Sequence, residues 1–464
     1  MSSEPSIQVR PEAWSGSDGR LARSVARPMV RFLAQETTSG ILLLIATAAA
    51  LIWANLPGEL GESYHRFWEM HVDIAIGDWH IFDESLEHFV NDALMALFFF
   101  VVGMEIKSEL MTGDLADPRV AALPAIGALG GMLLPAAIYA VLTAGTDGFS
   151  GWGVPMATDI AFAVGVLALL GPSVPQRLKL FLLTLAIVDD IGAILVIAVF
   201  YTTSIELIWL AVAIGLVALV GLMTRYRIWY TPVYALVGFV VWYATFRSGV
   251  HATIAGVALG LMAPARPLLE DRAFENVEDI LSGDRVDPTM IMDANWKMKE
   301  KIGVTTRLTQ LLSPWTSFVI IPIFALANAG IPLSGDALGA AASSRVTLGV
   351  VLGLVVGKTL GVSLFSYLAV RFNLASLPRG VSFAHIVGGG AVAGIGFTVA
   401  LFIARLAFAE DEGAEGASAS LAEEAIMGVL VASLLATLLG FILLRLAGSR
   451  ARPRVSPPLT RTAG

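Results

Sequence analysis

The sequence predicts an all-α membrane protein with twelve transmembrane helices, two of them discontinuous, and a small β-hairpin outside the membrane. Three observations predict this class. Hydrophobic residues make up 56% of the chain and charged residues only 15%, whereas about a quarter of the residues of soluble domains are charged. The apolar residues gather in runs long enough to cross a bilayer, which takes about 20 residues. Two of these runs contain clustered helix-breaking residues beside polar ones.

Twelve apolar segments can be counted along the chain. The seventh and the eighth are separated only by Phe246, Arg247 and Ser248, so they form either a tight helical hairpin or one broken span. An even number of crossings places both ends of the chain on the same side of the membrane. The segments lie near residues 40–57, 86–106, 120–143, 150–171, 179–202, 205–223, 231–246, 249–264, 311–332, 346–370, 383–408 and 422–445.

The basic residues predict which side this is, because cytoplasmic loops carry an excess of Lys and Arg. With the N-terminus inside, all but five of the 30 Lys and Arg residues fall in cytoplasmic segments. The acidic loop AEDEGAEGASASLAEE then lies outside. We therefore expect both termini in the cytoplasm. The five exceptions are Arg66, Arg247 and Arg345 in outer loops, and Lys358 and Arg405 within spans.

The segments beyond the spans are polar. A cytoplasmic tail, residues 1–39, precedes the twelve-span domain, residues 40–447, and a second tail, residues 448–464, follows it. The cytoplasmic stretch 265–310 is charged and of mixed sign, as a linker or a surface segment would be. The first tail runs straight into a full-length span, unlike a cleavable signal peptide.

Residues 58–85 form an outer segment that does not span the membrane. Its sequence HRFWEMHVDIAIGDWHIFD alternates apolar and polar residues around Gly77 and Asp78. This pattern predicts a small outer β-hairpin. The hairpin either caps the outer face or forms the contact of a homodimer.

Two spans carry helix-breaking stretches at corresponding places. The fourth contains GWGVP just before Thr158 and Asp159, and the eleventh contains GGGAVAGIGFT, which includes Gly394 and Gly396. Either stretch alone is as readily a packing feature. Each lies in the middle of a group of three spans, three to five and ten to twelve, and the two groups start from opposite sides of the membrane. That arrangement predicts an inverted repeat, with a binding site near the midplane where helices four and eleven meet.

Four ionisable side chains lie within the apolar runs. Lys358 interrupts VTLGVVLGLVVGKTLGVSLFSYLAV, Asp159 lies in the fourth span, and Asp189 and Asp190 lie in LKLFLLTLAIVDDIGAILVIAVFYT. A charge at the centre of a span costs about 2.5–3.5 kcal/mol on insertion scales, so we expect these groups to be functional. At the half-helix ends, Asp159 would offset the positive N-termini and Lys358 the negative C-termini.

The residue types indicate a site that binds a cation and exchanges protons. Hard cations such as sodium and lithium take oxygen ligands, which carboxylates, a threonine hydroxyl and backbone carbonyls supply. Burial disfavours the charged forms and pairing favours them, so such groups can release protons when a cation arrives. Asp189 and Asp190 are about 100° apart on a helix, so one can face Lys358 or Asp159 while the other faces water. The alternative is a fixed ion pair that holds the bundle together, although three acids against one base leave charge unpaired.

Three further titratable residues lie near the ends of spans. Asp92 lies near the outer end of the second span and Glu105 near its inner end, where charges usually pair locally or reach the interface. A role at the cytoplasmic mouth or in pH response stays open for all three residues, with attraction of cations assigned to Glu105. His251, in SGVHATIAGV, begins a helix on the outer side, where we expect a structural histidine rather than a proton carrier.

Other classes fit the residues less well. In a sodium-coupled symporter of an organic anion, Lys358 would bind the solute carboxylate, but three acids converging on one base disfavour an anion. A retinal proton pump would use the lysine in a Schiff base, but such pumps have seven spans with the lysine in the last. The chain has no GxxxxGK[ST] motif, which argues against an ATP-driven pump. It has no cysteine, which excludes disulfides, iron–sulfur clusters and thiol metal sites.

The chain resembles the NhaA-type sodium/proton antiporters. The combination of ATDIAFA with VDD is the most specific part of the resemblance. The matching stretches run in order over roughly residues 36–408 and read NDALMALFFFVVGMEIKSEL, ATDIAFAVGVLALLG, LAIVDDIGAI, SGVHATIAG, PIFALANAG, VVGKTLG and GIGFT.

The resemblance implies a twelve-helix fold with crossed, unwound helices four and eleven in the bacterial inner membrane. It also implies electrogenic exchange of two protons for one sodium or lithium ion. Asp189 and Asp190 would be the ion- and proton-binding pair, Thr158 and Asp159 would lie at the crossing, and Lys358 would pair with an aspartate. The implied partners are the transported ions and membrane lipid, with no cofactor and no nucleic acid.

The chain departs from this family at two places. Ser108 stands where members often carry an arginine, and LTQLLS precedes Pro314 where some members have a glutamate and histidines implicated in pH response. We therefore do not expect a strongly alkaline-activated profile.

Overall fold

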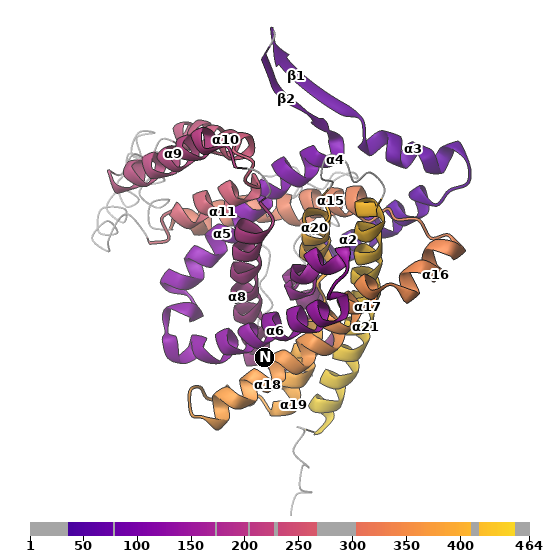
Figure 1. Cartoon of the computed structure of the whole chain (residues 1–464). Helices are drawn as coiled ribbons and strands as arrows, with labels where there is room; N and C mark the ends of the chain where they lie inside the picture. The colour runs from indigo at the N-terminus through magenta and orange to yellow at the C-terminus, as the bar shows by residue number, and fades with distance from the viewer. Residues whose placement is uncertain are drawn as a thin grey trace, which may run out of the picture.

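The computed structural model describes residues 36–77, 79–171, 174–202, 205–226, 231–266, 303–409 and 417–450. These residues form a helical body with a two-stranded sheet at one end (Figure 1). Most of the two predicted tails and of the predicted linker 265–310 lies outside the described residues.

A helix, or a run of adjoining helices, covers each predicted apolar segment. Helices prevail because a lipid-exposed chain must satisfy its backbone polar groups internally. In chain order they are α2 (Glu36–Ala54); α4 (Leu86–Phe89), η3 (Val90–Leu94) and α5 (Met95–Thr112); α6 (Pro118–Thr143); η5 (Asp147–Met156) and α7 (Ile160–Leu170); α8 (Gln176–Phe200); α9 (Leu207–Arg225); α10 (Thr231–Arg247); α11 (Thr253–Met262); α14 (Val304–Trp315), η8 (Thr316–Ile320) and α15 (Ile321–Asn328); α17 (Arg345–Leu352), η9 (Gly353–Gly357) and α18 (Lys358–Arg371); α19 (Phe383–Val392) and α20 (Phe397–Ala407); and α21 (Ala417–Arg450).

Fewer than the twelve predicted helices qualify as membrane-spanning when only helix length and composition are considered. Among the described residues, seven helices are long and apolar enough to cross, or nine if each of two bent pairs counts as one span. The helices over Thr38–Ala54 and Thr253–Met262 are apolar but shorter. The all-α membrane class is therefore supported, whereas the count of twelve and the inverted repeat stay predictions.

Both predicted helix interruptions are present as bends. The axes of η5 and α7 meet at 46°, and those of α19 and α20 at 49°. Three other long helices stay continuous but contain one π-helical turn each, at η3, η8 and η9. A π turn holds one residue more than an α turn, and such turns are frequent at functional sites. The turn at η9 ends directly before Lys358.

The strands β1 (His71–Ile76) and β2 (Trp79–Ser85) pair antiparallel, with His71 opposite Ser85 and Ile76 opposite Trp79. They project from one end of the body, which we call the hairpin end, beside α3 (Glu59–Trp68) (Figure 1). The helices α18 and α19 lie at the opposite end (Figure 1). Two helices have no counterpart among the predicted elements, namely α3 and α16 (Gly335–Ser343), which precedes α17.

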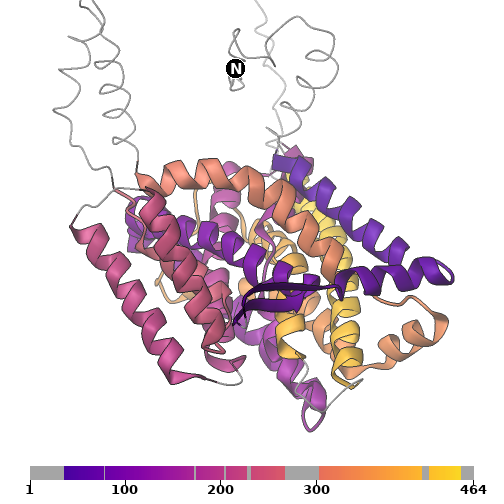
Figure 2. The same cartoon turned by 90° about the horizontal axis from the view of Figure 1, so that it is seen from above.

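Seen from the hairpin end, α9 and α10 pack against each other along one edge of the body (Figure 2). A short 3-10 turn, η4 (Asp114–Ala116), joins α5 to α6. Of these elements, α6, α7, α8, α18, α19 and α20 position the four buried ionisable residues.

Glycines allow α6 and α18 to approach closely enough to enclose a lysine between them. A Cβ on Gly361 of α18 would overlap the carbonyl group of Gly130 of α6, so these two backbones are in direct contact. A Cβ on Gly131 would lie 2.9 Å from Val362 Cγ2 and 3.5 Å from Lys358 Cδ. Small residues at such contacts let membrane helices pack tightly. The missing side chains leave the space that the stem of Lys358 fills.

Candidate functional site

The two interrupted spans cross each other and are joined by hydrogen bonds at their breaks. The backbone N–H of Asp159, just before α7, donates to the carbonyl oxygen of Ile395, just before α20, at 2.6 Å. The hydroxyl of Thr158 lies 2.8 Å from the carbonyl oxygen of Ala393. These bonds satisfy backbone groups that the breaks leave without helical partners, which is necessary in a buried setting.

Asp159 caps both half-helices that begin at the crossing. Its Oδ1 accepts from the N–H of Phe162 in α7 at 3.0 Å, and its Oδ2 accepts from the N–H of Thr398 in α20 at 3.1 Å. The hydroxyl of Thr398 also donates to Oδ2, at 2.6 Å. A helix N-terminus carries partial positive charge and free N–H groups, which a carboxylate stabilises. One carboxylate therefore serves both N-termini, as predicted for Asp159.

Lys358 and Asp189 form an ion pair in the interior, and neither side chain is exposed at all. The ammonium group contacts Asp189 Oδ2, and the hydroxyl of Thr158 lies 2.8 Å from the same oxygen. The sequence led us to expect that one aspartate of the Asp189–Asp190 pair faces Lys358, and Asp189 does so from α8. A buried pair is stable only if further hydrogen bonds offset the desolvation of its charges. The single hydroxyl proton of Thr158 can supply one, when it is donated to Asp189 rather than to the carbonyl oxygen of Ala393.

Two carboxylate oxygens at the site have no hydrogen-bond partner among the described residues. They are Oδ1 of Asp189 and Oδ1 of Asp190, and both are buried. Asp190 interacts with Asp189, Glu105 and Asp159 as like charges and with Lys358 as an opposite charge. An unpaired buried acceptor is costly unless a cation, a proton or water occupies it. Two such acceptors therefore lie together beside the crossing.

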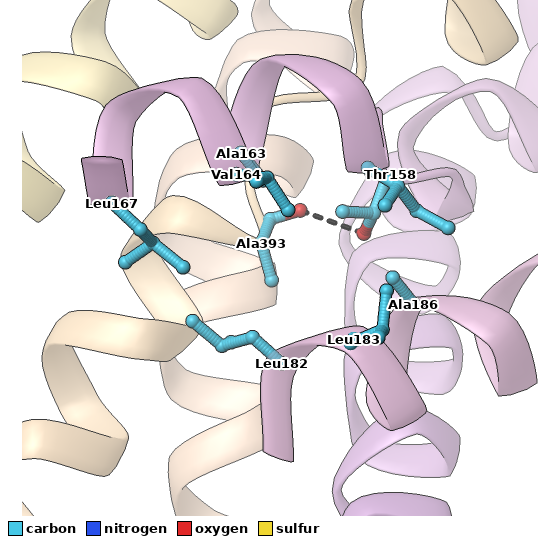
Figure 3. A pocket seen from close by; sticks show the side chains of 9 residues that line it. Thr158, Ala163, Val164, Leu167, Leu182, Leu183, Ala186 and Ala393 are labelled. Atoms are coloured by element: carbon cyan, nitrogen blue, oxygen red, sulfur yellow. Dashed lines mark hydrogen bonds between the residues drawn. The ribbon is translucent and has the colours of Figure 1, made fainter. Parts of the chain in front are cut away.

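An apolar hollow borders the crossing between α7 and α8 (Figure 3). Figure 3 shows the hydrogen bond from Thr158 to Ala393 at one edge of the hollow, with Ala186 and Leu183 of α8 facing α7. Ala186 lies one helical turn before Asp190. The full lining is Thr158, Ile160, Ala163, Val164, Leu167, Leu182, Leu183, Ala186 and Ala393.

The break glycines lie at the crossing, as their positions predict. A Cβ on Gly394 would overlap the carbonyl oxygen of Leu354, in η9, and a Cβ on Gly396 would lie 2.9 Å from Ala400 Cβ. Gly394 thus allows the break to approach the helix that carries Lys358. Two further groups at the crossing were not predicted, namely the hydroxyl of Thr398 and the carbonyl of Ala393. The only signal was their place beside these glycines.

The other three candidate residues lie outside this hydrogen-bonded cluster. Among the described residues, no hydrogen bond or ion pair joins Asp92, Glu105 or His251 to it. The backbone oxygen of Asp92 accepts from Trp242 Nε1 at 3.0 Å. Glu105 is half-buried in α5 and has Glu109 as a like-charged neighbour. His251 Nε2 lies 2.7 Å from the carbonyl oxygen of Tyr201 at the end of α8, as a structural histidine would.

Comparison with known proteins covers nearly the whole chain. The model of the family described as Na⁺/H⁺ antiporter 1 matches residues 30–444. A protein named Na⁺/H⁺ antiporter NhaA 3 from Frankia alni is 46% identical over 93% of this chain and 91% of its own length. One named Na⁺/H⁺ antiporter NhaA 2 from Myxococcus xanthus is also 46% identical, over 96% of this chain and 94% of its own. These matches confirm the resemblance drawn from the motifs, and the chain belongs to the Na⁺/H⁺ antiporter 1 family.

Proposed function

We propose that this multi-pass membrane protein exchanges sodium or lithium ions for protons across the bacterial inner membrane. As a member of an antiporter family it is a secondary transporter, not an enzyme, and it uses no cofactor beyond the transported ions. The observation that carries the proposal is the pair of unpartnered, buried Oδ1 atoms on Asp189 and Asp190, directly beside a crossing of two broken helices.

In the proposed cycle a cation binds Asp189 and Asp190, with Thr158 as a further oxygen ligand. Its arrival displaces the ammonium group of Lys358 from Asp189 and releases two protons, one from Asp190 and one from Lys358. Asp159 stays ionised throughout, because it must accept from both helix N-termini. The loaded site then opens to the other side, releases the cation and takes up two protons. One net charge moves per cycle, so the membrane potential contributes about 2.3 kcal/mol per 100 mV.

Sodium-driven collapse of a pH gradient in proteoliposomes tests this proposal. The unaltered protein should dissipate an imposed gradient on addition of sodium or lithium, and Asp190→Asn should not. Asp336→Asn is the matched control, because Asp336 is exposed in the first turn of α16, an element that contains none of the site residues. An Asp190→Asn protein that responds as strongly as the Asp336→Asn control would contradict the proposed site.

Lys358 has two roles that the same assay separates. If it carries a transported proton, Lys358→Ala should still exchange ions but no longer respond to the membrane potential. If it only stabilises the empty site, Lys358→Ala should keep its voltage response and lose thermal stability. The comparison needs a potassium diffusion potential of each sign across the same vesicles.

The organic-anion symporter receives no support. The relatives are named for sodium and protons, and the ammonium group that would bind a solute carboxylate is fully buried against Asp189. Sodium-driven uptake of a labelled carboxylate, without movement of protons, would support the symporter instead.

We also propose that both termini are cytoplasmic, that β1 and β2 are on the outer face, and that these strands mediate a homodimer. The distribution of Lys and Arg supports the orientation. The projection of the strands beyond the helical body supports the contact. A single cysteine at Asp73 in β1 should form a disulfide between two copies under oxidation, and its accessibility to an impermeant reagent on intact cells reads the orientation. Glu105 would then attract cations at the opposite, cytoplasmic mouth.

A further inference from the structure

At the hairpin end, α20 contacts the beginning of the second span and the end of α15 through polar side chains. Arg405 Nη1 lies 3.5 Å from Glu87 Oε1 in α4, and Arg405 Nη2 lies 3.4 Å from the carbonyl oxygen of Asn328 at the end of α15. The amides of Asn91 and Asn328 donate to each other, at 3.2 and 2.8 Å. Three segments far apart in the sequence are therefore joined at one place beneath β1 and β2 (Figure 1).

An aromatic layer joins the same three segments deeper in the body. The ring of Phe402 in α20 packs on Phe99 in α5 and on Phe324 in α15, with centroid distances of 5.5 and 6.2 Å. All three rings are buried. Such pairs contribute beyond the area they bury, and together the rings fill the space between α20 and its two neighbours.

Phe99 also closes a second hollow on the hairpin side of the site. This hollow is lined by Phe99, by Ile194 and Ile197 of α8, and by residues of α11 that include Val257. Ile194 lies one helical turn beyond Asp190, on the opposite side from Ala186 in the first hollow. Helix α8 thus borders one small apolar hollow before its two carboxylates and another after them, and the second, which has no room for a water molecule, abuts the aromatic layer.

The helix periodicity explains why these side chains form two continuous stripes. On α20, Thr398, Phe402 and Arg405 are spaced i, i+4 and i+7, which places them on one face. On the second span, an uninterrupted α-helix would set Phe99 about 120° around the axis from Glu87. The π turn η3, between them, adds one residue and reduces this offset to about 20°. Without that turn, Glu87 and Phe99 could not both face α20.

We propose that these two layers, the polar one of Glu87, Asn91, Asn328 and Arg405 and the aromatic one of Phe99, Phe324 and Phe402, are the outer gate of the ion path. For the site to open toward the hairpin end, α20 must separate from α5 and α15 here. The inference rests on the proposed exchange function, because a gate presupposes transport. It couples directly to the site, since the first turn of α20 is bound to Asp159 through Thr398.

The hydrogen bonds of the polar layer are weak enough to break and re-form during transport. Its two arginine contacts are long, at 3.4 and 3.5 Å, and the Nε of Arg405 is buried without a partner among the described residues. By contrast, α15 is firmly held on its other side by Tyr64 of α3, whose hydroxyl lies 2.8 Å from the carbonyl oxygen of Ala327 and accepts from the N–H of Gly330. Burial raises the pKa of Tyr64 to about 12, so it stays a neutral donor. Opening therefore moves α20 away from a fixed α15.

A reporter cysteine tests the gate, because the chain has no cysteine of its own. Ile197→Cys places a thiol in the hollow behind Phe99, and a charged, membrane-impermeant thiosulfonate is applied to intact cells and, separately, to inverted vesicles. Adding Arg405→Gln should raise the labelling rate from outside about tenfold, which corresponds to about 1.4 kcal/mol in the closed-to-open equilibrium. Arg66→Gln is the matched control, because its exposed pair with Glu62 lies in α3.

An unchanged labelling rate in the Arg405→Gln protein, or a rate that rises only when the reagent is applied from the inner face, would contradict the proposed gate.

A second experiment locks the gate in its closed state. Glu87→Cys with Arg405→Cys, bridged by a short bifunctional thiosulfonate, ties α20 to the second span and should lose sodium-driven exchange and regain it on reduction, whereas Glu62→Cys with Arg66→Cys should be unaffected. Full exchange in the bridged Glu87–Arg405 protein would also contradict the gate. If the unaltered protein shows no exchange, the proposed function fails while the labelling arm still reports on the closure.

Discussion

The two helix breaks at the crossing have nearly the same bend, 46° and 49°, but different means of stabilisation. The break before α7 supplies its own cap, because Asp159 is the N-cap residue and accepts from Phe162. The break before α20 has Gly396 at its N-cap, with no side chain to offer, and borrows the second oxygen of Asp159 instead. The break before α7 thus provides the charged cap, Asp159, and the break before α20 provides the space that its glycines leave open.

This difference shows how one carboxylate, that of Asp159, can stabilise both helix breaks without taking part in the proposed binding of the cation. Asp159 is occupied on both oxygens by backbone and hydroxyl donors. Asp189 and Asp190 each keep an oxygen without a partner among the described residues. In the proposed cycle, Asp159 therefore has the structural role and Asp189 and Asp190 have the transport role.

The largest effect is expected from removing the shared cap. In Asp159→Asn the side chain has only one acceptor oxygen, so its NH₂ must face either the N–H of Phe162 or the two donors of Thr398. We expect a loss of about 3 kcal/mol, because hydrogen bonds to a buried charged group contribute about 1.5–3 kcal/mol each. Exchange should fall together with the unfolding temperature in detergent.

The matched control for this substitution is Asp147→Asn. Asp147 is exposed in the first turn of η5, on the same interrupted span, so the change removes an equal charge without touching the crossing. Equal unfolding temperatures for the two variants would show that the caps are not the source of stability at the breaks.

A smaller effect is expected from filling the space on the other side of the crossing. In Gly394→Ala the new methyl group would overlap the carbonyl oxygen of Leu354, a backbone atom that cannot rotate away. Such overpacking costs about 1–3 kcal/mol, and it should push η9 and Lys358 away from Asp189. Gly165→Ala in α7 is the control, because no atom lies within 4 Å of a Cβ there. If both variants exchange sodium at the same rate, close contact at Gly394 is not required.

The sequence predicts the site residues better than it predicts their partners. Lys358, Asp159, Asp189 and Asp190 are conspicuous because a charge in an apolar run is costly. That Lys358 pairs with Asp189 rather than with its neighbour depends on how α8 is rotated against α18, which no local pattern encodes. The π turns at η3 and η9 escaped prediction for a similar reason, since they adjust the phase of a helix to its tertiary contacts.

Thr398 illustrates the same limit at one residue. A threonine in a continuous helix commonly donates to the carbonyl four residues earlier, as Thr184 does to Leu180 and Thr245 does to Val241. The break at Gly394–Gly396 leaves Thr398 no helical carbonyl at that position, so its hydroxyl turns to Asp159. Only a structure in which the two breaks cross reveals the difference.

The smallest effect, and the most direct test of this division of roles, is expected from Thr398→Val. The substitution removes the hydroxyl bond to Asp159 but keeps the backbone N–H bond and the side-chain shape. We expect a loss of about 1 kcal/mol and a lower turnover with little change in the sodium concentration for half-maximal exchange, because Thr398 orients Asp159 and does not contact the cation. Thr398→Ser should restore turnover, and Thr437→Val, which removes only a bond within α21, should not lower it. A weakened apparent affinity for sodium with unchanged turnover would instead make Thr398 a ligand of the ion, and the second break would then supply chemistry as well as space.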